Sequence, residues 1–464
     1  MNIDYDRLGI KDKHIGVYGI GGSTGRSLLK FLKNFPCHPV LYDDKFQQLL
    51  EERPWLQQAY KEEEIDFAEV SEDLLKCDLI VTSPGVPLNK LILRRAREKE
   101  IMVISEIELA INLYDRFIIA ITGTNGKTTT VSLLGEILKK GFTESEIKIA
   151  GNIGQPLIEV LPESSQDAII VAEVSSFQLA GSYNFSPDIA ILLNFAPDHL
   201  DWHPDVTHYR RSKEKIFNSK DEDSLAIING DNETVENMAS SAAGEIKRVS
   251  LNDRDADILV KDDVFQWIEG KQNKLIEGDR VKMAGRHNLM NAGFAVLAAL
   301  ELDVSPCIIR EAVYDFTPPS HRMEIFIREN DFVGIDDSKA TNPHAVSAAL
   351  ASLNFDERTV VIVGGQDRNV NLTPMIEAII NYTDFCVVIG ELAEKIKLML
   401  NKREYQNVFS ADSLHEAVEK GLDMLNHSGQ LILSPGAPSW DMFENYRKRG
   451  KIFKSSVEKK LRKE

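Results

Sequence analysis

The sequence lacks the features that mark membrane-spanning, secreted and metal-storing proteins. It contains no uninterrupted apolar run of the length that a membrane helix needs, and its start, Met1–Asp6, is acidic and without a signal-peptide pattern. We therefore expect a cytoplasmic protein with no membrane partner. Cysteine is scarce too: the 4 cysteines show no metal-ligand spacing, and we expect reduced, buried thiols at Cys37, Cys77, Cys307 and Cys386.

Basic residues are in deficit. With 72 acidic against 54 basic side chains, the formal net charge is -18, which argues against nucleic acid as a partner. An anionic substrate must then be held by locally placed lysines, arginines and helix N-termini. The length of 464 residues is enough for about three domains. We expect a monomer that binds small molecules.

The most informative stretch is a candidate phosphate-binding loop. Apolar residues 117–121 predict a buried strand, and the following TGTNGKTTT, residues 122–130, leads into an amphipathic helix that runs to about residue 140. Gly123 and Gly126 permit a tight turn close to an anion, and Lys127 supplies a positive charge. The first glycine of the general pattern is missing, so the loop is a shorter variant. The alternative is an ordinary strand-to-helix turn.

Polar residues follow the next predicted strands in the same block. The strand at 168–172 leads to Glu173, and the strand at 189–193 leads to a loop that contains His199. Because ligands bind at the carboxyl ends of parallel strands, both side chains could meet a magnesium ion beside Thr128. Each also has a structural alternative, as a cap, a surface charge or a hydrogen-bonded histidine. Lys213 lies in a basic helical run, and composition alone places it on a solvated face.

The first and last parts of the chain also alternate between strands and helices. Residues 14–18 and the glycine-rich 19–25 form a Rossmann-like opening, although structural glycines are an equally good interpretation. Further strands are predicted at 39–42, 78–81, 102–104, 333–335, 360–363 and 431–433. Boundaries are expected near residue 114 and, because prolines stiffen a link between compact units, at Pro318 and Pro319.

A set of strings in fixed order carries a family resemblance. TGTNGKTTT, GNIG, EVSSFQL, NFAPDHLDWH, YRRSK, GRHNLMN, HRME, DDSKATN and SPGAPSWDMF span nearly the whole chain, and together they resemble the Mur ligases of bacterial cell-wall synthesis. The resemblance implies an α/β protein with a Rossmann-like N-terminal domain, a central P-loop ATPase domain with a mainly parallel sheet, and a Rossmann-like C-terminal domain. These domains are expected at residues 1–114, 115–317 and 318–464.

The last two strings are most similar to the branch of the family that adds D-glutamate. The resemblance implies an ATP-dependent ligase that joins D-glutamate to UDP-N-acetylmuramoyl-L-alanine through an acyl phosphate. It also implies two Mg²⁺ ions and a carbamylated lysine at Lys213. The catalytic residues would be Lys127, His199, Lys213 and Lys339, and the metal ligands Thr128, Glu173, His199 and the modified Lys213.

The remaining site residues are assigned by position in the same strings. Nucleotide contacts would come from Gly123, Thr124, Asn125, Gly126, Lys127, Thr128, Thr129, Asn152, Asn288, Asn291, Arg322 and Asp337. Substrate contacts would come from Ser23, Thr24, Asp43, Asp44, Ser83, Pro84, Gly85, Thr341, Arg368, Ser439 and Tyr446.

Three departures from the family pattern concern substrate contacts. Arg368 stands where a lysine is expected, Tyr446 where phenylalanine is frequent, and the first glycine loop is one residue longer. Arginine can grip a carboxylate through two parallel hydrogen bonds, but it differs from lysine in reach and geometry.

Other functions remain open at this stage. A ligase for a different amino acid would share the same loops, whereas the first glycine-rich domain and the residues after Ser439 argue against a folate-polyglutamylating enzyme. A nucleotide-dependent switch is a different class, but the chain has no Asn-Lys-x-Asp guanine signature. A degenerate binding subunit would have lost site residues, yet every named catalytic position holds a chemically competent type.

Overall fold

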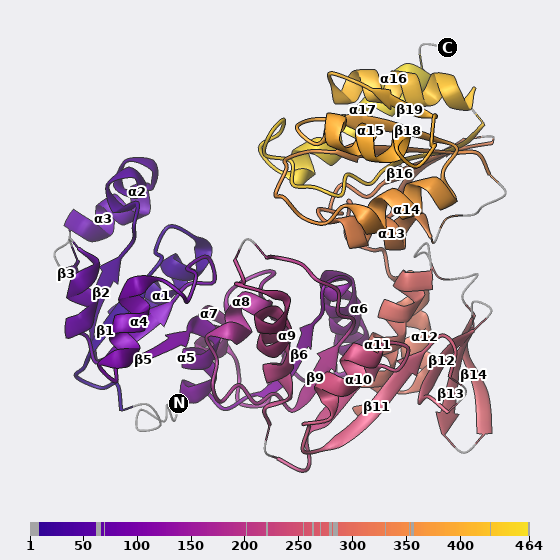
Figure 1. Cartoon of the computed structure of the whole chain (residues 1–464). Helices are drawn as coiled ribbons and strands as arrows, with labels where there is room; N and C mark the ends of the chain where they lie inside the picture. The colour runs from indigo at the N-terminus through magenta and orange to yellow at the C-terminus, as the bar shows by residue number, and fades with distance from the viewer. Residues whose placement is uncertain are drawn as a thin grey trace. The chain divides into compact units, whose positions relative to one another are not determined.

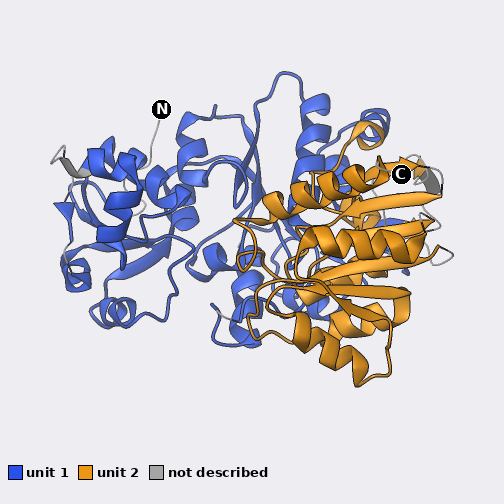
Figure 2. Ribbon diagram, turned by 90° about the horizontal axis from the view of Figure 1, so that it is seen from above, with its two compact units in different colours: residues 1–259, 266–275, 293–312 blue, residues 260–265, 276–292, 313–464 orange. Residues whose placement is uncertain are grey.

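The computed structural model describes most of the chain. The described residues are 9–61, 66–68, 70–200, 202–219, 221–253, 255–261, 264–269, 271–277, 281, 286–329, 331–351, 353, 357–426 and 428–462. They form two compact units, residues 1–259, 266–275 and 293–312 in the first and 260–265, 276–292 and 313–464 in the second (Figure 2). No helix in these ranges combines the length and apolar character that crossing a membrane requires.

The first sheet is wholly parallel, with strand order β3-β2-β1-β4-β5. Its strands are β1 (His14–Tyr18), β2 (His38–Tyr42), β3 (Asp66–Phe67), β4 (Leu79–Thr82) and β5 (Met102–Ser105). The connecting elements are α1 (Ser23–Lys33), α2 (Phe46–Glu52), α3 (Pro54–Lys61), η1 (Ser71–Lys76), α4 (Leu91–Glu98) and α5 (Glu106–Leu113). Alternate residues of β1 and β4 enter cores on opposite faces, as expected for a parallel sheet covered on both sides.

The second sheet carries the predicted phosphate loop and has the order β14-β13-β12-β11-β10-β9-β6-β8-β7. Its strands are β6 (Phe117–Thr122), β7 (Ile147–Gly151), β8 (Ile169–Glu173), β9 (Ile189–Leu192), β10 (Leu225–Asn229), β11 (Glu245–Ser250), β12 (Ile258–Lys261), β13 (Val264–Glu269) and β14 (Lys271–Glu277). The seven strands β7-β8-β6-β9-β10-β11-β12, in this order across the sheet, are all parallel to their neighbours. Their carboxyl ends therefore share one edge.

The helices of this block are α6 (Lys127–Gly141), α7 (Leu157–Glu163), α8 (Ser176–Ala180), α9 (Val206–Glu214), η2 (Lys215–Phe217), α10 (Glu233–Ala239), α11 (Arg286–Glu301) and α12 (Pro306–Asp315). Figure 1 shows α6, α9 and α10 close to β6 and β9 of this sheet. The structure confirms the predicted strands at 117–121, 168–172 and 189–193 and the helix after residue 126. The observed ends differ from the predicted ends by about one residue.

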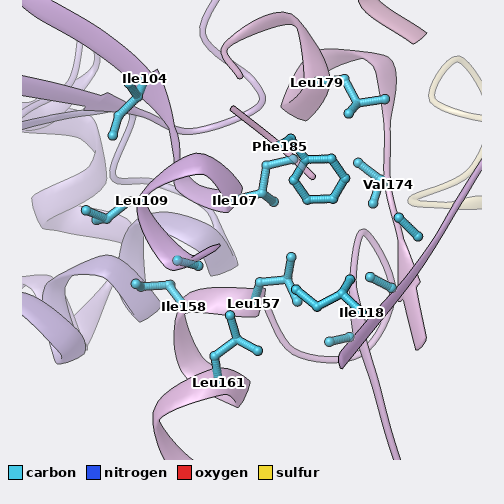
Figure 3. Close-up of a cluster of buried hydrophobic side chains, with 14 of the residues drawn as sticks. Ile104, Ile107, Leu109, Ile118, Leu157, Ile158, Leu161, Val174, Leu179 and Phe185 are labelled. Atoms are coloured by element: carbon cyan, nitrogen blue, oxygen red, sulfur yellow. The ribbon is translucent and has the colours of Figure 1, made fainter. Parts of the chain in front are cut away.

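A continuous core joins the first two sheets inside the first unit. Side chains from β5 and α5 pack against α7 and the segments after β8, as Figure 3 shows for Ile107, Leu157 and Phe185. Within this seam the carboxylate of Glu106 is fully buried and accepts a hydrogen bond of 2.7 Å from Ile158 N. Its Oε2 has no hydrogen-bond partner, and burial raises the pKa of Glu106 to about 7.

The third sheet lies in the second unit and has the order β15-β16-β20-β17-β18-β19. Its strands are β15 (Glu324–Glu329), β16 (Phe332–Asp336), β17 (Thr359–Gly364), β18 (Phe385–Ile389), β19 (Val408–Ser410) and β20 (Gly429–Leu433), and only β15 is antiparallel to its neighbour. One core contains residues of α13 (Pro343–Leu350), α14 (Thr373–Tyr382) and α15 (Ala393–Asn401). The other contains residues of α16 (Leu414–Leu425) and α17 (Tyr446–Leu461).

The cysteines correct one prediction. Cys77 and Cys386 are buried, but Cys37 is only partly buried and Cys307 is exposed. Cys307 is the second residue of α12, where the first turn of the helix faces outward. The three-domain division stays a prediction, since the first sheet and most of the second lie in one compact unit.

Candidate active site

The loop between β6 and α6 turns sharply at its glycines. The backbone φ is 157° at Gly123 and 87° at Gly126, values that favour glycine. A Cβ added to Gly123 would lie 3.0 Å from that of Leu193 on the neighbouring strand end. The turn presents the first N–H groups of α6 at the carboxyl edge of the sheet. A helix N-terminus in this position is suited to a phosphate.

Lys127 begins α6 and folds back over the loop. Its Nζ donates to Gly123 O at 2.7 Å and to Thr124 O at 3.0 Å. The loop is tied to the segment after β9, because Asn125 N donates to Asn194 Oδ1 at 2.9 Å and Thr124 Oγ1 donates to Ala196 O at 3.0 Å. The ammonium group is thus held directly beside the turn.

Glu173, at the end of β8, connects two other predicted site residues. Its Oε2 accepts from Thr128 Oγ1 and its Oε1 accepts from Asn152 Nδ2, both at 2.8 Å, and the side chain is buried. Thr129, the next residue of α6, is also buried. A carboxylate, a hydroxyl and an amide therefore converge at the phosphate loop. Oxygen donors of this kind suit Mg²⁺.

The structure overturns the placement of Lys213 on a solvated face. Lys213 is only 1% exposed, because α9 turns the face that carries Tyr209, Ser212 and Lys213 inward. Its Nζ donates to Gly123 O at 2.8 Å and to Thr122 Oγ1 at 3.3 Å, and it lies 5.0 Å from the centre of the Tyr209 ring. Lys213 and Lys127 share one acceptor, the carbonyl oxygen of Gly123.

Burial lowers the pKa of Lys213. Desolvation, followed by repulsion from Lys127, holds the pKa of the Lys213 amine well below its usual value, although Asp198 and Glu173 act in the opposite direction. A lysine in this environment is a neutral amine over a wider pH range. A neutral amine is the nucleophilic form of the side chain.

His199 lies in the loop after β9, with a left-handed backbone at φ 54°. Its Nε2 is 3.7 Å from Asp198 Oδ2, and its ring packs edge-on against Phe177 with centroids 4.9 Å apart. The side chain is 40% exposed. It is therefore accessible from solvent and held by contacts with its own loop and with α8.

Sequence reasoning missed a histidine pair behind this loop. His203 is buried, its Nε2 is 2.9 Å from Ser176 Oγ, and its Nδ1 is 2.8 Å from His208 Nδ1. Burial lowers the pKa of His203 to about 3, which keeps the ring neutral. The pair ties the start of α8 to α9. The sequence offered one signal for this pair, the second histidine of the DHLDWH run, which is His203.

In the first sheet, the predicted sugar-nucleotide residues gather at the ends of β1, β2 and β4. Ser23 and Thr24 open α1, and Asp43 Oδ2 accepts from the glycine-loop amides of Ile20 at 2.9 Å and Gly21 at 3.4 Å. Asp43 thus fixes the glycine-rich turn itself.

Asp44 accepts from Tyr18 Oη at 2.7 Å and from Lys90 Nζ at 2.8 Å. Ser83, followed by Pro84 and Gly85, donates through Oγ to Gly19 O. Strand β1 lies between β2 and β4, where the order of successive strands reverses. Ligands of open parallel sheets bind at this point.

The second unit carries the other predicted residues. Asp337 is buried and accepts hydrogen bonds from Ser434 Oγ at 2.7 Å and from Met323 N at 3.2 Å. Met323 directly follows Arg322 in the chain. Burial raises the pKa of Asp337 to about 7. Asn288 and Asn291 are buried on α11, with Asn291 Nδ2 3.4 Å from Asn288 Oδ1.

The remaining candidates surround the ends of β16, β17 and β20. Lys339 Nζ lies 4.1 Å from the centre of the Tyr446 ring, and Thr341 directly precedes the residue that caps α13. Ser439 is buried in the loop after β20. Arg368 lies in the loop after β17, with Cζ 4.9 Å from the centre of the Trp440 ring.

A buried arginine beneath these loops was not predicted. Arg449, 1% exposed on α17, donates through Nη2 to Ser338 O and Ala437 O, both at 3.0 Å, and through Nε to Ser338 Oγ at 3.2 Å. It therefore holds together the two loops that carry Lys339 and Ser439. Its position in a helix rich in lysine and arginine gave no signal of burial.

Among the described residues, one other group has metal-ligand types in close proximity: His321, Glu324 and Asp336. Lys454 Nζ lies 2.8 Å from Glu324 Oε1 and 3.7 Å from Asp336 Oδ2. The ammonium group of Lys454 therefore offsets one of the two carboxylate charges of this group.

Three family models match consecutive parts of the chain. They are the N-terminal domain of MurD-like Mur ligases at residues 13–105, the Mur ligase middle domain at 121–299 and the glutamate ligase domain of Mur ligases at 321–437. The chain belongs to the Mur ligase family.

Curated relatives support the same assignment over the full length. UDP-N-acetylmuramoylalanine--D-glutamate ligase from Caldicellulosiruptor bescii is 34% identical over 460 residues, covering 98% of this chain and 99% of its own. The protein of the same name from Caldicellulosiruptor saccharolyticus is 36% identical over 451 residues, with 96% and 98% covered. This Mur ligase therefore aligns with these relatives from end to end.

Solved structures share the fold. The MurF ligase of Thermotoga maritima, determined in complex with ADP, has a TM-score of 0.59 at 16% identity, with 99% of both chains covered. A pseudomurein peptide ligase type C from Methanothermus fervidus also has a TM-score of 0.59, at 19% identity, covering 96% of this chain and 99% of its own. The predicted α/β Mur ligase fold is confirmed.

Proposed function

We propose that this Mur ligase uses ATP to join D-glutamate to UDP-N-acetylmuramoyl-L-alanine in the cytoplasmic synthesis of peptidoglycan precursors. Family membership supports ATP-dependent ligation, and the names of the full-length relatives support D-glutamate as the added amino acid. The observation that carries the proposal is the convergence of Thr128 and Asn152 on Glu173 beside the Lys127 turn. This arrangement is suited to a nucleoside triphosphate with a divalent cation.

The donor set fits magnesium. Thr128 and Glu173 would hold a first Mg²⁺, and His199, together with a carbamylated Lys213, would serve a second. When bound, these ions would neutralise charge on the phosphoryl oxygens. The lowered pKa of Lys213 supports carbamylation, because only a neutral amine can attack CO₂ and lose a proton to form a carbamate. Modification would turn a buried cation into an anion.

The chemistry begins with a poor electrophile, the carboxylate of the alanyl group. One of its oxygens attacks the γ-phosphorus of ATP, ADP departs, and an acyl phosphate is formed. The amine of D-glutamate then attacks the carbonyl carbon, a proton is lost, and phosphate leaves with the amide behind. Lys127 and Lys339 would place positive charge around the transferred group, and the helix N-terminus would orient it.

The remaining residues would hold the three substrates. The adenine would contact Asn288 and Asn291, with Arg322 and Asp337 completing the nucleotide site. The loops of the first sheet would bind the UDP-sugar through Ser23, Thr24, Asp43, Asp44, Ser83, Pro84 and Gly85. D-glutamate would be held by Thr341, Arg368, Ser439 and Tyr446. We assign the sugar nucleotide to a domain at residues 1–114, ATP to a domain at 115–317, and the amino acid to a domain at 318–464.

The test is phosphate release from ATP with UDP-N-acetylmuramoyl-L-alanine present. D-glutamate, L-glutamate, D-aspartate, L-lysine and meso-diaminopimelate are added one at a time. We expect release only with D-glutamate, and background release from Lys127→Ala. Lys139→Ala is the matched control, because Lys139 lies exposed at the other end of the same helix, where it pairs with Glu136.

Two outcomes would change the proposal. Release with another amino acid would support the mechanism but show a different amino-acid specificity. Arg368 and Tyr446 would then be the first residues to test. Release that needs no amino acid, or no release at all, would refute the ligase.

A further inference from the structure

We propose that Trp440 is a positioning residue for Arg368, and that stacking between the two side chains sets the affinity for a carboxylate of the incoming amino acid. The inference rests on the proposed function, because it concerns how that amino acid is selected. Trp440 lies within the family string SPGAPSWDMF, but none of the proposed substrate contacts involves it.

Trp440 is unusual in its exposure. Its side chain is 62% exposed, although a large aromatic ring gains most when it leaves water. The ring centre lies 4.9 Å from Arg368 Cζ, within the range of a cation–π contact. The indole therefore covers the guanidinium group from a position outside the core.

The backbone on both sides of this contact is fixed. Gln366 N donates to Pro438 O at 3.0 Å, which joins the loop of Arg368 to the loop that precedes Trp440. Phe443 N donates to Ser439 O at 2.7 Å and closes a turn around Trp440. Gly365 allows the close approach, since a Cβ there would collide with Pro438 O. The contact between Arg368 and Trp440 therefore joins two loops whose backbones are already tied together.

Stacking and carboxylate binding use different parts of the guanidinium group. An aromatic ring covers a flat face, whereas a carboxylate accepts hydrogen bonds in the plane, along the edge. The ring can thus hold the plane in one orientation without competing for the substrate. Ordering the side chain before binding lowers the entropy lost on binding. A lysine at this position has no plane to orient, so the benefit of Trp440 depends on arginine.

The experiment measures KM for D-glutamate, KM for ATP and kcat in Trp440→Leu and Trp440→Phe. We expect Trp440→Leu to raise KM for D-glutamate about threefold to fivefold, the range of an exposed cation–π contact, with kcat within about twofold. KM for ATP should not move. Trp440→Phe keeps a ring and should restore KM for D-glutamate to within about twofold of the wild type.

A double-mutant cycle isolates the pair. In the Arg368→Lys background, Trp440→Leu should change KM for D-glutamate by less than about 1.5-fold. Phe409→Leu, which also removes a partly exposed ring from the same unit, is the matched control and should leave all three constants unchanged.

The outcomes separate this inference from the function on which it rests. An unchanged KM in Trp440→Leu, or an equal rise in the Arg368→Lys background, would overturn it while D-glutamate addition stands. If the wild type proves to use another amino acid, the same series is run with that amino acid and the same criteria decide. Phosphate release that needs no amino acid would overturn both.

Discussion

Among the residues that the structure describes, each unit buries one lysine or arginine side chain almost completely, and burial shifts the pKa of the two side chains differently. Lys213 and Arg449 are both 1% exposed, and each donates to backbone carbonyl oxygens of site loops. Burial holds the pKa of Lys213 well below its normal value but lowers that of Arg449 only to about 10, so that Arg449 stays protonated at neutral pH.

The neighbours explain the difference. Lys213 shares its acceptor with another lysine, Lys127, which opposes the support from Asp198 and Glu173, whereas the charged neighbours of Arg449 are Asp441, Asp336 and Asp337, all of which favour its charge. Burial alone therefore does not decide what a basic residue does. In the first unit burial favours the neutral form of Lys213, and in the second it leaves Arg449 as a cation that joins two loops.

The largest effect is expected from Lys213→Arg. An arginine is always charged and cannot form a carbamate, so we expect phosphate release to fall by roughly 100-fold to 1000-fold with the fold retained. Removing dissolved CO₂ should lower wild-type activity and leave the variant unchanged. Arg211→Lys, on the exposed face of α9, is the control. Near-normal activity in Lys213→Arg would show that the amine has no chemical task.

The second prediction tests the structural cation. Arg449→Met removes three donors and leaves Ser338 O and Ala437 O without them, and we expect a loss of about 3 kcal/mol in unfolding free energy. Urea unfolding checks this, with Arg447→Met, two residues away and exposed, expected to change stability by less than about 0.5 kcal/mol. Equal effects of the two substitutions would contradict the comparison.

The third prediction extends the comparison to a buried acid. Burial raises the folded pKa of Glu106 to about 7 from its ordinary value of 4.5, so its contribution to stability is present below about pH 4.5 and is lost as pH rises through 7. Glu106→Gln removes this dependence. We expect the variant to gain stability relative to the wild type between pH 5 and pH 8, by about 2 kcal/mol. Parallel pH profiles of the two proteins would contradict the assigned pKa.

The smallest effect on activity is expected at Lys215, two residues from Lys213. Its Nζ donates to Ala180 O and Ser182 O, both at 2.7 Å, and burial lowers its pKa as well. Lys215→Met should cost about 1 kcal/mol of stability but keep kcat within about threefold of the wild type. A loss of activity like that of Lys213→Arg would mean that burial, rather than position at the phosphate loop, is what matters.

The sequence predicted the parts of the fold that depend on local pattern. Apolar runs identified the parallel strands, and Gly126 followed by Lys127 identified the start of α6. The antiparallel strand β15 and the extension through β13 and β14 were not predicted, because their sequences, EIFIRE, VFQWIE and KQNKLIE, mix polar with apolar residues and lack the continuous apolar runs of the buried parallel strands.

Burial of individual polar residues was the harder problem. Lys213 and Arg449 both lie in helical runs rich in basic residues, and which side of such a helix faces the core depends on the segments that pack against it. The pair of His203 and Ser176 joins residues 27 positions apart, which no local pattern reveals. The family strings contained Ser176, His203 and Lys213 but not Arg449, and a string does not tell which of its residues contact a loop and which face water.

Strand β8 has a consequence for how the active site can change during evolution. All five of its residues pair with strands on both sides; the first four, Ile169 to Ala172, are apolar, while the side chain of the fifth, Glu173, lies at the phosphate loop. One residue therefore separates the part of the strand under selection for stability from the part under selection for chemistry. Loops beyond such ends can diverge to accept new substrates while the strands that carry them are inherited unchanged.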